Sequence, residues 1–435
     1  MGGAEVRKSS PAVMIRPPEP LPMAVTTNGT IKLTSFDRGC VKVPVTVLLV
    51  FEHMGHEATD NIKRALSQAL VHYYPFAGRI IISSSGGVDG DEFSIRCTGD
   101  GVEFLTASMD CSLKEAKILE ESSCAKINPL RNELAILYPF GSFGSEDDPL
   151  LSVQVTEFSC GGHVLGVSWS HAIADAAGMA QFLAAVGELA RGSPSPSVVP
   201  VRWDDVVSRL EPWPSPMLQA MLAFPETQGL ELTANLDITI PSALIKCVKD
   251  DYLSCGGFDG QPCTVFEVVV AIVWRCHIRA TMSNNNPGNP AYLSFASNMR
   301  KYVGSKDGYY GNCGADRLIS GATRSSVAEA GFLDLIRMVK RAKDQLPDNG
   351  QLMQGLRDRY DLMHVTSWRN VGFEQVDLGG GAPAGVMFHG REGGTPPVPI
   401  CIMHPACKGM DGVNLLLVTA KEHVDAFLGE LAKHT

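Results

Sequence analysis

The sequence has no hydrophobic segment long enough to cross a membrane. Its longest predominantly apolar run, residues 43–51, is about half of the roughly 20 residues that a spanning helix needs. The first 25 residues contain several prolines and lack the apolar core of a secretory signal. These absences predict a cytoplasmic protein without a membrane partner.

Basic residues are also fewer than acidic residues. The chain has 37 Lys and Arg against 47 Asp and Glu, and its formal net charge is -10. Proteins that bind nucleic acid neutralise phosphates with an excess of basic side chains, so this balance argues against a nucleic-acid partner. A phosphorylated ligand would have to be held by a local cluster of cations rather than by the overall field.

Several signatures of metal and nucleophile chemistry are missing. The twelve cysteines include no CxxC pair, and the closest two, Cys401 and Cys407, lack a second ligand pair at the spacing of a zinc site. The GxSxG, HExxH and P-loop patterns are absent as well. We therefore predict reduced cysteines in the core, no metal site and no permanently bound cofactor.

Strand and helix patterns follow one another along the whole chain. Apolar residues recur at helical spacing in residues 57–73, and residues 150–170 have the pattern of two strands joined at Gly161-Gly162. A helix is predicted from Asp175 to Arg191, where a basic residue in the last turn is followed by a glycine. Alternation of this kind predicts an α/β protein.

A proline-rich stretch separates two halves of similar length. Residues 192–216 carry six prolines, which cannot join the interior of a helix or a sheet and suit an extended connection. A chain of 435 residues also exceeds what a single core usually serves. We predict an N-terminal domain over residues 1–191, a crossover loop over 192–222 and a C-terminal domain over 223–435.

The segment from Ser168 to Asp175 is a candidate for catalysis. It places His171 just after a predicted strand and Asp175 at the start of a predicted helix, a junction where functional residues gather. An imidazole that takes a proton from a hydroxyl or amine contributes typically about 10²- to 10⁴-fold in rate. Asp175 also fits a helix N-cap, so the spacing by itself leaves a catalytic and a structural role equally open.

Thr264 and Glu267 mark the start of another helix. A hydroxyl residue three positions before Glu is the capping-box pattern, and apolar residues then recur at helical spacing as far as His277. This pattern predicts a buried helix with His277 in the core. Thr264, at the helix N-terminus, can also donate a hydrogen bond to a phosphate.

These motifs resemble those of the BAHD acyltransferases, plant enzymes that use acyl-CoA donors in specialised metabolism. The resemblance covers essentially the whole chain. Its motifs, in order, are Leu33-Thr-Ser-Phe-Asp37, Tyr74-Pro-Phe-Ala-Gly-Arg79, the His171 to Asp175 segment, Thr264 to Cys276, Ser297-Asn-Met-Arg300, Gly311-Asn312 and, in the place of the DFGWG signature, Val376 to Gly381.

The resemblance implies a fold and a mechanism. It implies two similar-sized chloramphenicol-acetyltransferase-like α/β domains with mixed sheets, and an active-site channel at their interface. His171 would deprotonate the acceptor, which attacks the thioester carbonyl of acyl-CoA without an acyl-enzyme intermediate. Asp175 and Asp377 would support the site structurally, and Arg275 or Arg279 is the candidate partner of Asp377.

The resemblance also implies substrate-binding positions. CoA phosphates need local cations and the pantetheine arm needs polar partners, so the CoA candidates are Thr264, Ser297, Arg300 and Lys301. The channel candidates are Thr34, Ser35 and Gly380. Because Gly380 stands where the family has Trp, we predict a more open acceptor side.

The predicted function is acyl transfer from acyl-CoA to a hydroxyl or amine of a small specialised metabolite. An aromatic acyl group such as benzoyl or hydroxycinnamoyl is favoured over acetyl. The acceptor is an alcohol, a phenol or an amine, and the protein is expected to be a monomer. The alternatives are a catalytically impaired relative that binds a ligand, motivated by the altered DFGWG segment, and a thioester hydrolase.

Overall fold

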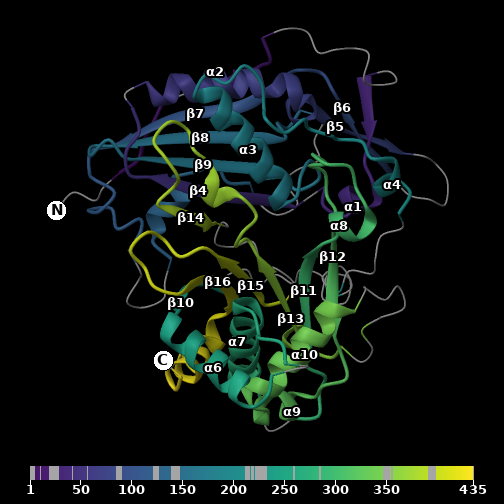
Figure 1. Ribbon diagram of the computed structural model, residues 1–435. Coiled ribbons are helices and arrows are strands. Elements are labelled where there is room, and N and C mark those ends of the chain that lie inside the picture. Colours follow the sequence, from purple (N-terminus) through teal and green to yellow (C-terminus); the bar gives the residue numbers. More distant parts are fainter. Residues whose placement is uncertain are drawn as a thin grey trace.

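The chain folds into three β-sheets, the two larger of which are covered by helices (Figure 1). This computed structural model describes the chain except for residues 1–4, 10, 19–28, 42, 56, 85–90, 121–126, 139–146, 211–215, 217–219, 221–232, 258–259, 284–285, 346–352, 354–355, 390–397 and 435. The predicted end of the crossover loop, at residues 222–223, lies outside the described residues.

The first large sheet is built mainly by the N-terminal half. Its strand order is β1-β7-β8-β9-β4-β14, with β2 also paired to β7. Only β7 and β8 pair in parallel. The bounds are β1 Arg7–Lys8, β2 Val13–Ile15, β4 Pro44–Phe51, β7 Val102–Met109, β8 Leu151–Phe158, β9 His163–Ser170 and β14 Gly385–Phe388. Strand β14 thus comes from the C-terminal half and completes the N-terminal sheet.

The second large sheet belongs to the C-terminal half and is mixed. Its order is β10-β16-β15-β13-β11-β12, in which β13 runs parallel to both β11 and β15. The bounds are β10 Thr233–Ile240, β11 Tyr292–Asn298, β12 Gly314–Ile319, β13 Leu362–Ser367, β15 Ile400–His404 and β16 Val413–Ala420. A small third sheet consists of β3 Thr30–Lys32, β6 Asp91–Arg96 and β5 Arg79–Ser84.

Helices lie on the outer side of each large sheet, so the two sheets occupy the middle of the molecule (Figure 1). Helices α2 and α3 cover the N-terminal sheet, and α6, α7 and α10 cover the C-terminal sheet. The bounds are α1 Ser35–Arg38, α2 Ala58–His72, α3 Ala176–Ala190, α4 Asp205–Ser208, α6 Ser242–Ser254, α7 Val265–Thr281, α8 Arg300–Val303, α9 Arg324–Glu329, α10 Phe332–Asp344 and α11 Val424–Ala432. Short 3-10 turns are Tyr74–Ala77, Pro129–Glu133, Arg359–Asp361, Phe373–Gln375 and Lys421–His423.

The local sequence patterns are confirmed. The predicted helix at 57–73 is α2, and its apolar residues at helical spacing are buried. The predicted hairpin is β8 and β9, which pair antiparallel on either side of Gly161. Asp175 caps α3 by accepting from Gly178 N, and Thr264 forms a capping box with Glu267 at the start of α7.

The prediction of core cysteines is only partly right. The eleven cysteines within the described residues are all free, but Cys160, Cys247 and Cys255 are exposed. Cys160 lies in the hairpin turn, and the other two lie on α6 and at its end, where neither position faces the core. Single exposed apolar side chains are normal on protein surfaces.

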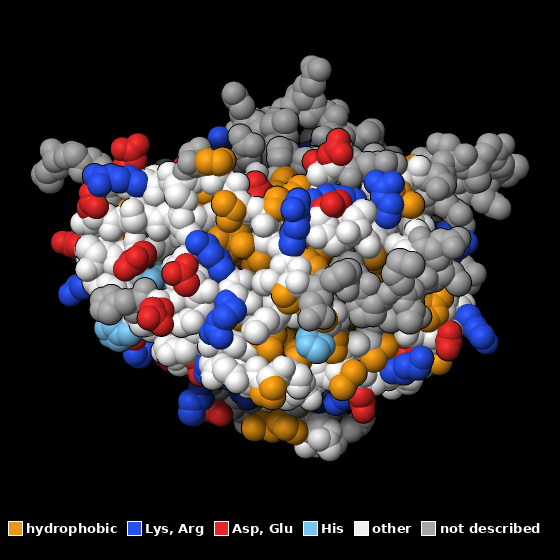
Figure 2. All heavy atoms as spheres, turned by 90° about the horizontal axis from the view of Figure 1, so that it is seen from above, with side chains coloured by type: hydrophobic (Ala, Val, Ile, Leu, Met, Phe, Trp, Pro, Cys, Tyr) orange, Lys and Arg blue, Asp and Glu red, His pale blue; other side chains and the backbone are white. Residues whose placement is uncertain are grey.

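None of the helices in the described part of the chain combines the length and the apolarity needed to cross a bilayer. Figure 2 views the α2–α3 side and shows Lys and Arg interspersed with Asp and Glu rather than gathered in one basic patch. On this face, charge therefore offers no broad surface for a polyanion.

Candidate active site

His171 directly follows the last residue of β9. Strand β4 starts beside this end of β9, with Pro44 opposite Ser170. The backbone N–H of His171 donates to Val43 O at 2.8 Å, and a turn closes when Ile173 N donates to Ser170 O at 3.1 Å. The sheet register therefore sets the position of the His171 backbone.

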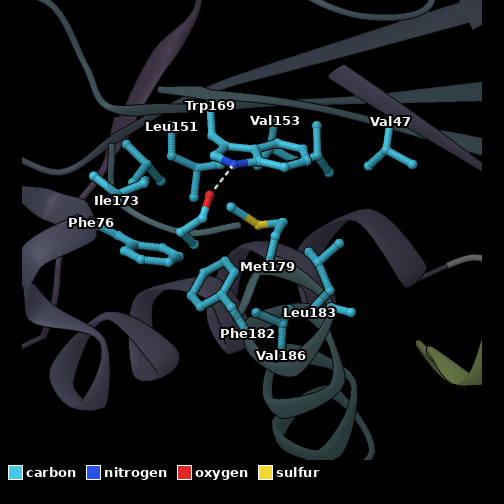
Figure 3. Close-up of a cluster of buried hydrophobic side chains, with 14 of the residues drawn as sticks. Val47, Phe76, Leu151, Val153, Trp169, Ile173, Met179, Phe182, Leu183 and Val186 are labelled. Carbon is cyan, nitrogen blue, oxygen red and sulfur yellow. Dashed lines mark hydrogen bonds between the residues drawn. The ribbon is translucent and has the colours of Figure 1, made fainter. Parts of the chain in front are cut away.

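The loop after His171 packs against the hydrophobic core. The indole Nε1–H of Trp169 donates to Ala174 O at 3.0 Å (Figure 3). Figure 3 also shows Ile173 at the side of the cluster near Phe76, and Met179 of α3 between Trp169 and Phe182. Residues 172–174 are buried, so their packing leaves the loop little freedom.

The carboxylate of Asp175 binds α3 and the C-terminal half. Its Oδ1 accepts from Gly178 N at 2.9 Å and from Arg300 Nη2 at 2.8 Å. Its Oδ2 accepts from Cys313 N at 3.2 Å. These contacts give Asp175 two structural tasks, since it caps α3 and fastens the loop to residues 300–313.

A buried ion pair ties three distant segments to His171. Asp37 of α1 and Arg202 of the crossover segment lie 2.9 Å apart, with side chains 0% and 3% exposed. Asn312 donates to Asp37 Oδ1 through Nδ2 at 2.8 Å and to His171 O, also through Nδ2, at 2.7 Å. We call Asp37, Arg202 and Asn312 the clamp.

The clamp keeps the Asp37 carboxyl ionised. Burial alone would raise the pKa of Asp37, but the charge of Arg202 and the hydrogen bonds from Asn312 and Thr34 lower it below its ordinary value. Asp37 and Asn312 lie in motifs that the resemblance contains, yet no sequence pattern indicated that they meet. Arg202 lies in a stretch with the composition of a connection, and nothing in that composition marks a buried ion pair.

The imidazole of His171 is half-buried. Its Nδ1 has no accessible surface and no hydrogen-bond partner among the described residues. Cys40, in the turn between α1 and β4, contacts the ring. Burial would lower the pKa of His171, but its interaction with Cys40, together with the charge of Asp175, raises it to about 9.

The predicted partner of Asp377 is wrong. Asp377 Oδ2 lies 3.6 Å from Arg191 Nη1, at the C-terminal end of α3, and Arg191 also donates to Asp377 O. Arg275 instead donates to Ala330 O, and Arg279 pairs with Glu430. Both predicted arginines lie on α7, which covers the outer side of the C-terminal sheet (Figure 1).

Asp377 organises the glycine-rich turn that follows it. Its Oδ1 accepts from Gly379 N at 2.8 Å and from Gly381 N at 2.9 Å. Gly379 and Gly381 have φ of 106° and 86°, values that favour glycine. The carboxylate thus holds the turn while Arg191 fastens it to α3.

The structure contradicts the expectation that Gly380 leaves an open acceptor side. A Cβ at this position would stand 2.1 Å from His53 O and 3.1 Å from Met54 Cγ. The backbone after β4 therefore fills the space into which a side chain would point. Restoring the family's Trp at Gly380 would require the backbone to move.

The remaining channel candidates have internal partners. Thr34 is 3% exposed, and its hydroxyl donates to Asp37 Oδ2 at 2.8 Å within the capping box of α1. Ser35 is half-buried and donates to Leu210 O at 2.7 Å. Thr34 is thus committed to the support of the clamp.

The CoA candidates lie in one region but differ in availability. Ser297 ends β11 next to α8, which carries Arg300 and the exposed Lys301. The exposed Thr264 is near, since Phe266 of α7 contacts Phe295 of β11 with ring centroids 5.4 Å apart. Arg300 is already committed, because it binds Asp175, Gly311 O and Tyr309 O. Its part in CoA binding stays a prediction.

Comparison with known sequences identifies the family. The model of the Transferase family matches residues 12–433. Acyl transferase 15 of Oryza sativa subsp. japonica is 42% identical over 98% of both chains. Myricetin 3-O-glucosyl 1,2-rhamnoside 6'-O-caffeoyltransferase AT1 of Crocosmia x crocosmiiflora is 30% identical over 99% of both. 3'-N-debenzoyl-2'-deoxytaxol N-benzoyltransferase of Taxus canadensis is 30% identical over 95% of this chain and 92% of the relative.

Solved structures share the fold. Vinorine synthase matches with a TM-score of 0.74 at 21% identity, over 99% of this chain and 98% of that one. TRI101 of F. sporotrichioides, complexed with coenzyme A and T-2, matches with a TM-score of 0.67 at 15% identity, over 91% and 96%. The chain belongs to the BAHD family of acyl-CoA-dependent acyltransferases.

Proposed function

We propose that the protein transfers an acyl group from acyl-CoA directly to a hydroxyl or amine, with His171 as the general base. The observation that carries the proposal is the setting of the imidazole. His171 lies where the end of β9, the turn before β4 and residues 300–313 meet. Each of these segments forms hydrogen bonds with the backbone of His171 or with the loop that follows it. Since Nδ1 has no accessible surface, we assign the proton transfer to Nε2.

In the proposed reaction, Nε2 of His171 takes the proton of the acceptor as the acceptor attacks the thioester carbonyl. The tetrahedral intermediate collapses, the C–S bond breaks, and the CoA thiolate takes the proton back from the imidazolium. Asp175 takes no part in proton transfer, since its oxygens are bound to Arg300, Cys313 N and Gly178 N. It acts as a positioning residue.

An aromatic acyl group is favoured by aromatic side chains close to the catalytic loop. Trp368, which follows β13, lies 6.1 Å from Trp169 and 5.1 Å from Phe388 of β14 between ring centroids. Trp169 and Trp368 are themselves buried, so the ring that can offer surface to an acyl group is that of the half-buried Phe388, which packs against Trp368. The caffeoyl- and benzoyltransferase names of two relatives agree with this proposal.

We further propose that residues 1–191 and 223–435 act as two domains around a channel, joined by a crossover at 192–222 and interlocked by β14. The ion pair of Asp37 with Arg202 supports this division, because the crossover segment lies against the N-terminal half there. We also propose that the protein is a cytoplasmic monomer.

A donor and acceptor panel tests the proposed function. Purified protein is mixed with acetyl-, benzoyl- and hydroxycinnamoyl-CoA, each with and without a set of alcohols, phenols and amines, and free thiol is followed. We expect release that needs both substrates and is fastest with an aromatic donor. Release without an acceptor would indicate a thioester hydrolase, and binding without release would indicate an impaired relative.

The raised pKa of His171 predicts the pH dependence of catalysis. A general base must be neutral, so kcat/KM should rise with pH and level off only above about 9. Cys40→Ala removes the largest stabilisation of the imidazolium. The pKa read from the rise of kcat/KM should then move toward the ordinary histidine value of about 6.5. The matched control is Cys160→Ala, at an exposed cysteine in the hairpin turn. Superimposable profiles for Cys40→Ala and wild type would contradict the assignment of the base.

A further inference from the structure

The buried arginines differ in how their charge is balanced. Those within the described residues are Arg79, Arg131, Arg202, Arg275, Arg317 and Arg324. Arg131, Arg202 and Arg324 form ion pairs with carboxylates. Arg79 and Arg275 lie within the field of acidic side chains. For Arg317, the one electrostatic partner in the described part of the chain is the Tyr302 hydroxyl.

Arg317 lies on β12 and is 3% exposed. Its Nε donates to Ser297 Oγ at 3.4 Å, and its Nη2 reaches only Met299 Sδ, at 4.0 Å. Its Nη1 is buried and has no partner in the described part of the chain. The ring of Tyr302 lies over the guanidinium, 5.7 Å from its centre. The hydrogen bonds to this cation are thus few and long.

A buried charge without an opposite charge is costly. Removing a guanidinium from water costs several kcal/mol, which only a close counter-charge or strong hydrogen bonds offset. Burial lowers the pKa of Arg317 for this reason. Among the described residues the Arg317 cation thus has no counter-charge, and an anion placed beside Nη1 would both neutralise it and accept its N–H.

We propose that Arg317, together with the Ser297 hydroxyl, forms a subsite for a phosphate group of CoA. This inference rests on the proposed function, which brings acyl-CoA to His171. In this proposal Arg317 is the buried cation that contacts CoA, because Arg300 is bound to Asp175. Lys301 is exposed and can add only a screened charge.

The position of Arg317 fits this ligand. Cys313, whose N–H binds Asp175, precedes Arg317 by four residues, and β12 begins at the next residue. An extended chain rises about 3.3 Å per residue, so the subsite lies about 13 Å along the strand from the catalytic loop. The pantetheine arm of CoA likewise separates the reactive sulfur from the phosphates.

Tyr302 covers the subsite in the ligand-free structure. It is 63% exposed and sits on the four-residue helix α8. Because most of its surface already faces solvent, its ring can turn outward without loss of core packing. A phosphate would then reach Nη1, and the ring would lie at the rim of the subsite.

The test compares Arg317→Met with wild type in three measurements. The variant removes an unbalanced buried charge, so the Tm of the ligand-free protein should rise by about 1 °C or more. The Kd of adenosine 3',5'-bisphosphate should increase on the order of 10- to 100-fold, the range for a hydrogen bond to a charged group. The KM of benzoyl-CoA should increase by a similar factor at nearly unchanged kcat, whereas the KM of benzoyl-pantetheine should not change.

Arg337→Met is the matched control. Arg337 lies on α10 and is ion-paired with Asp334 of the same helix, so neither Tm nor Kd should respond in the same way. Arg317→Lys keeps the charge but loses the planar fork, and its bisphosphate affinity should fall between wild type and Arg317→Met. The lysine variant keeps the test decisive if the methionine variant does not fold.

Two results would overturn the proposal. An unchanged Kd of the bisphosphate in Arg317→Met would show that Arg317 does not bind phosphate. An equal rise in KM for benzoyl-CoA and benzoyl-pantetheine would place its effect on another part of the ligand. The binding measurement needs no turnover, so it separates failure of the subsite from failure of the proposed acyl transfer.

Discussion

His171→Ala is expected to lower kcat for acyl transfer by about 10²- to 10⁴-fold, the usual contribution of a general base. The acceptor hydroxyl or amine would then have to lose its proton without help. CoA binding should remain, because the proposed phosphate subsite on β12 makes no contact with the imidazole. The measurements are kcat with the preferred donor and acceptor and the Kd of CoA.

The variant is expected to remove the imidazole without moving the loop. The backbone N–H and C=O of His171 bind Val43 and Asn312, and neither bond uses the imidazole, so the loop should keep its place in the variant. His72→Ala, at an exposed position at the end of α2, should leave kcat unchanged. Turnover by His171→Ala within a few-fold of wild type would refute the proposed base.

Arg202→Met is expected to destabilise the protein by about 3–5 kcal/mol, since it leaves the Asp37 carboxylate buried without its counter-charge. The clamp would keep its hydrogen bonds from Thr34 and Asn312 but lose its only ion pair among the described residues. Urea unfolding at pH 7 gives the free energy of unfolding. Because Asn312 also binds His171 O, a fall in kcat should accompany the loss of stability.

The pH dependence and a double variant isolate the buried charge. The folded-state pKa of Asp37 is depressed, so its stabilisation is present above the unfolded pKa and is lost as the pH falls through the folded value. In Arg202→Met the unpaired carboxyl can relieve its cost by taking up a proton. The difference in stability from wild type should therefore shrink as the pH falls from 7 toward 4.

Asp37→Asn combined with Arg202→Met removes both charges and should recover part of the lost stability. The amide keeps only one acceptor oxygen, so it can accept from Asn312 or from Thr34 but not from both, and the recovery should therefore be partial. Equal stability of the single and the double variant at all pH values would show that the ion pair is not what holds the clamp.

Local sequence patterns predicted local structure well. The apolar spacing of residues 57–73 is the buried face of α2, and the Thr264 capping box opens α7. The spacing also predicted that Asp175 fits a helix N-cap, and the structure shows it accepting from Gly178 N as the cap of α3. Such features depend on residues within one or two turns of each other, whose geometry the backbone itself sets.

The family resemblance extended the prediction from local elements to the fold of the whole chain, because the order of several motifs carries more information than any one of them. The Transferase family match over residues 12–433 confirms the family, and the solved structures confirm the fold. The prediction for Gly380 failed because a one-letter difference from a motif does not reveal which neighbouring backbone occupies the space. Here it is the backbone of His53.

The sequence by itself determined the elements, the family and the candidate base. Only the tertiary structure decided which charges meet: Arg191 rather than an arginine of α7 holds Asp377, Arg300 holds Asp175, and Arg202 holds Asp37. Each pair joins residues more than a hundred positions apart, so no periodic pattern in the sequence indicates the pairing. Arg317 depends on tertiary structure in the same way, because the lack of a counter-charge among the described residues can be recognised only once its neighbours in space are known.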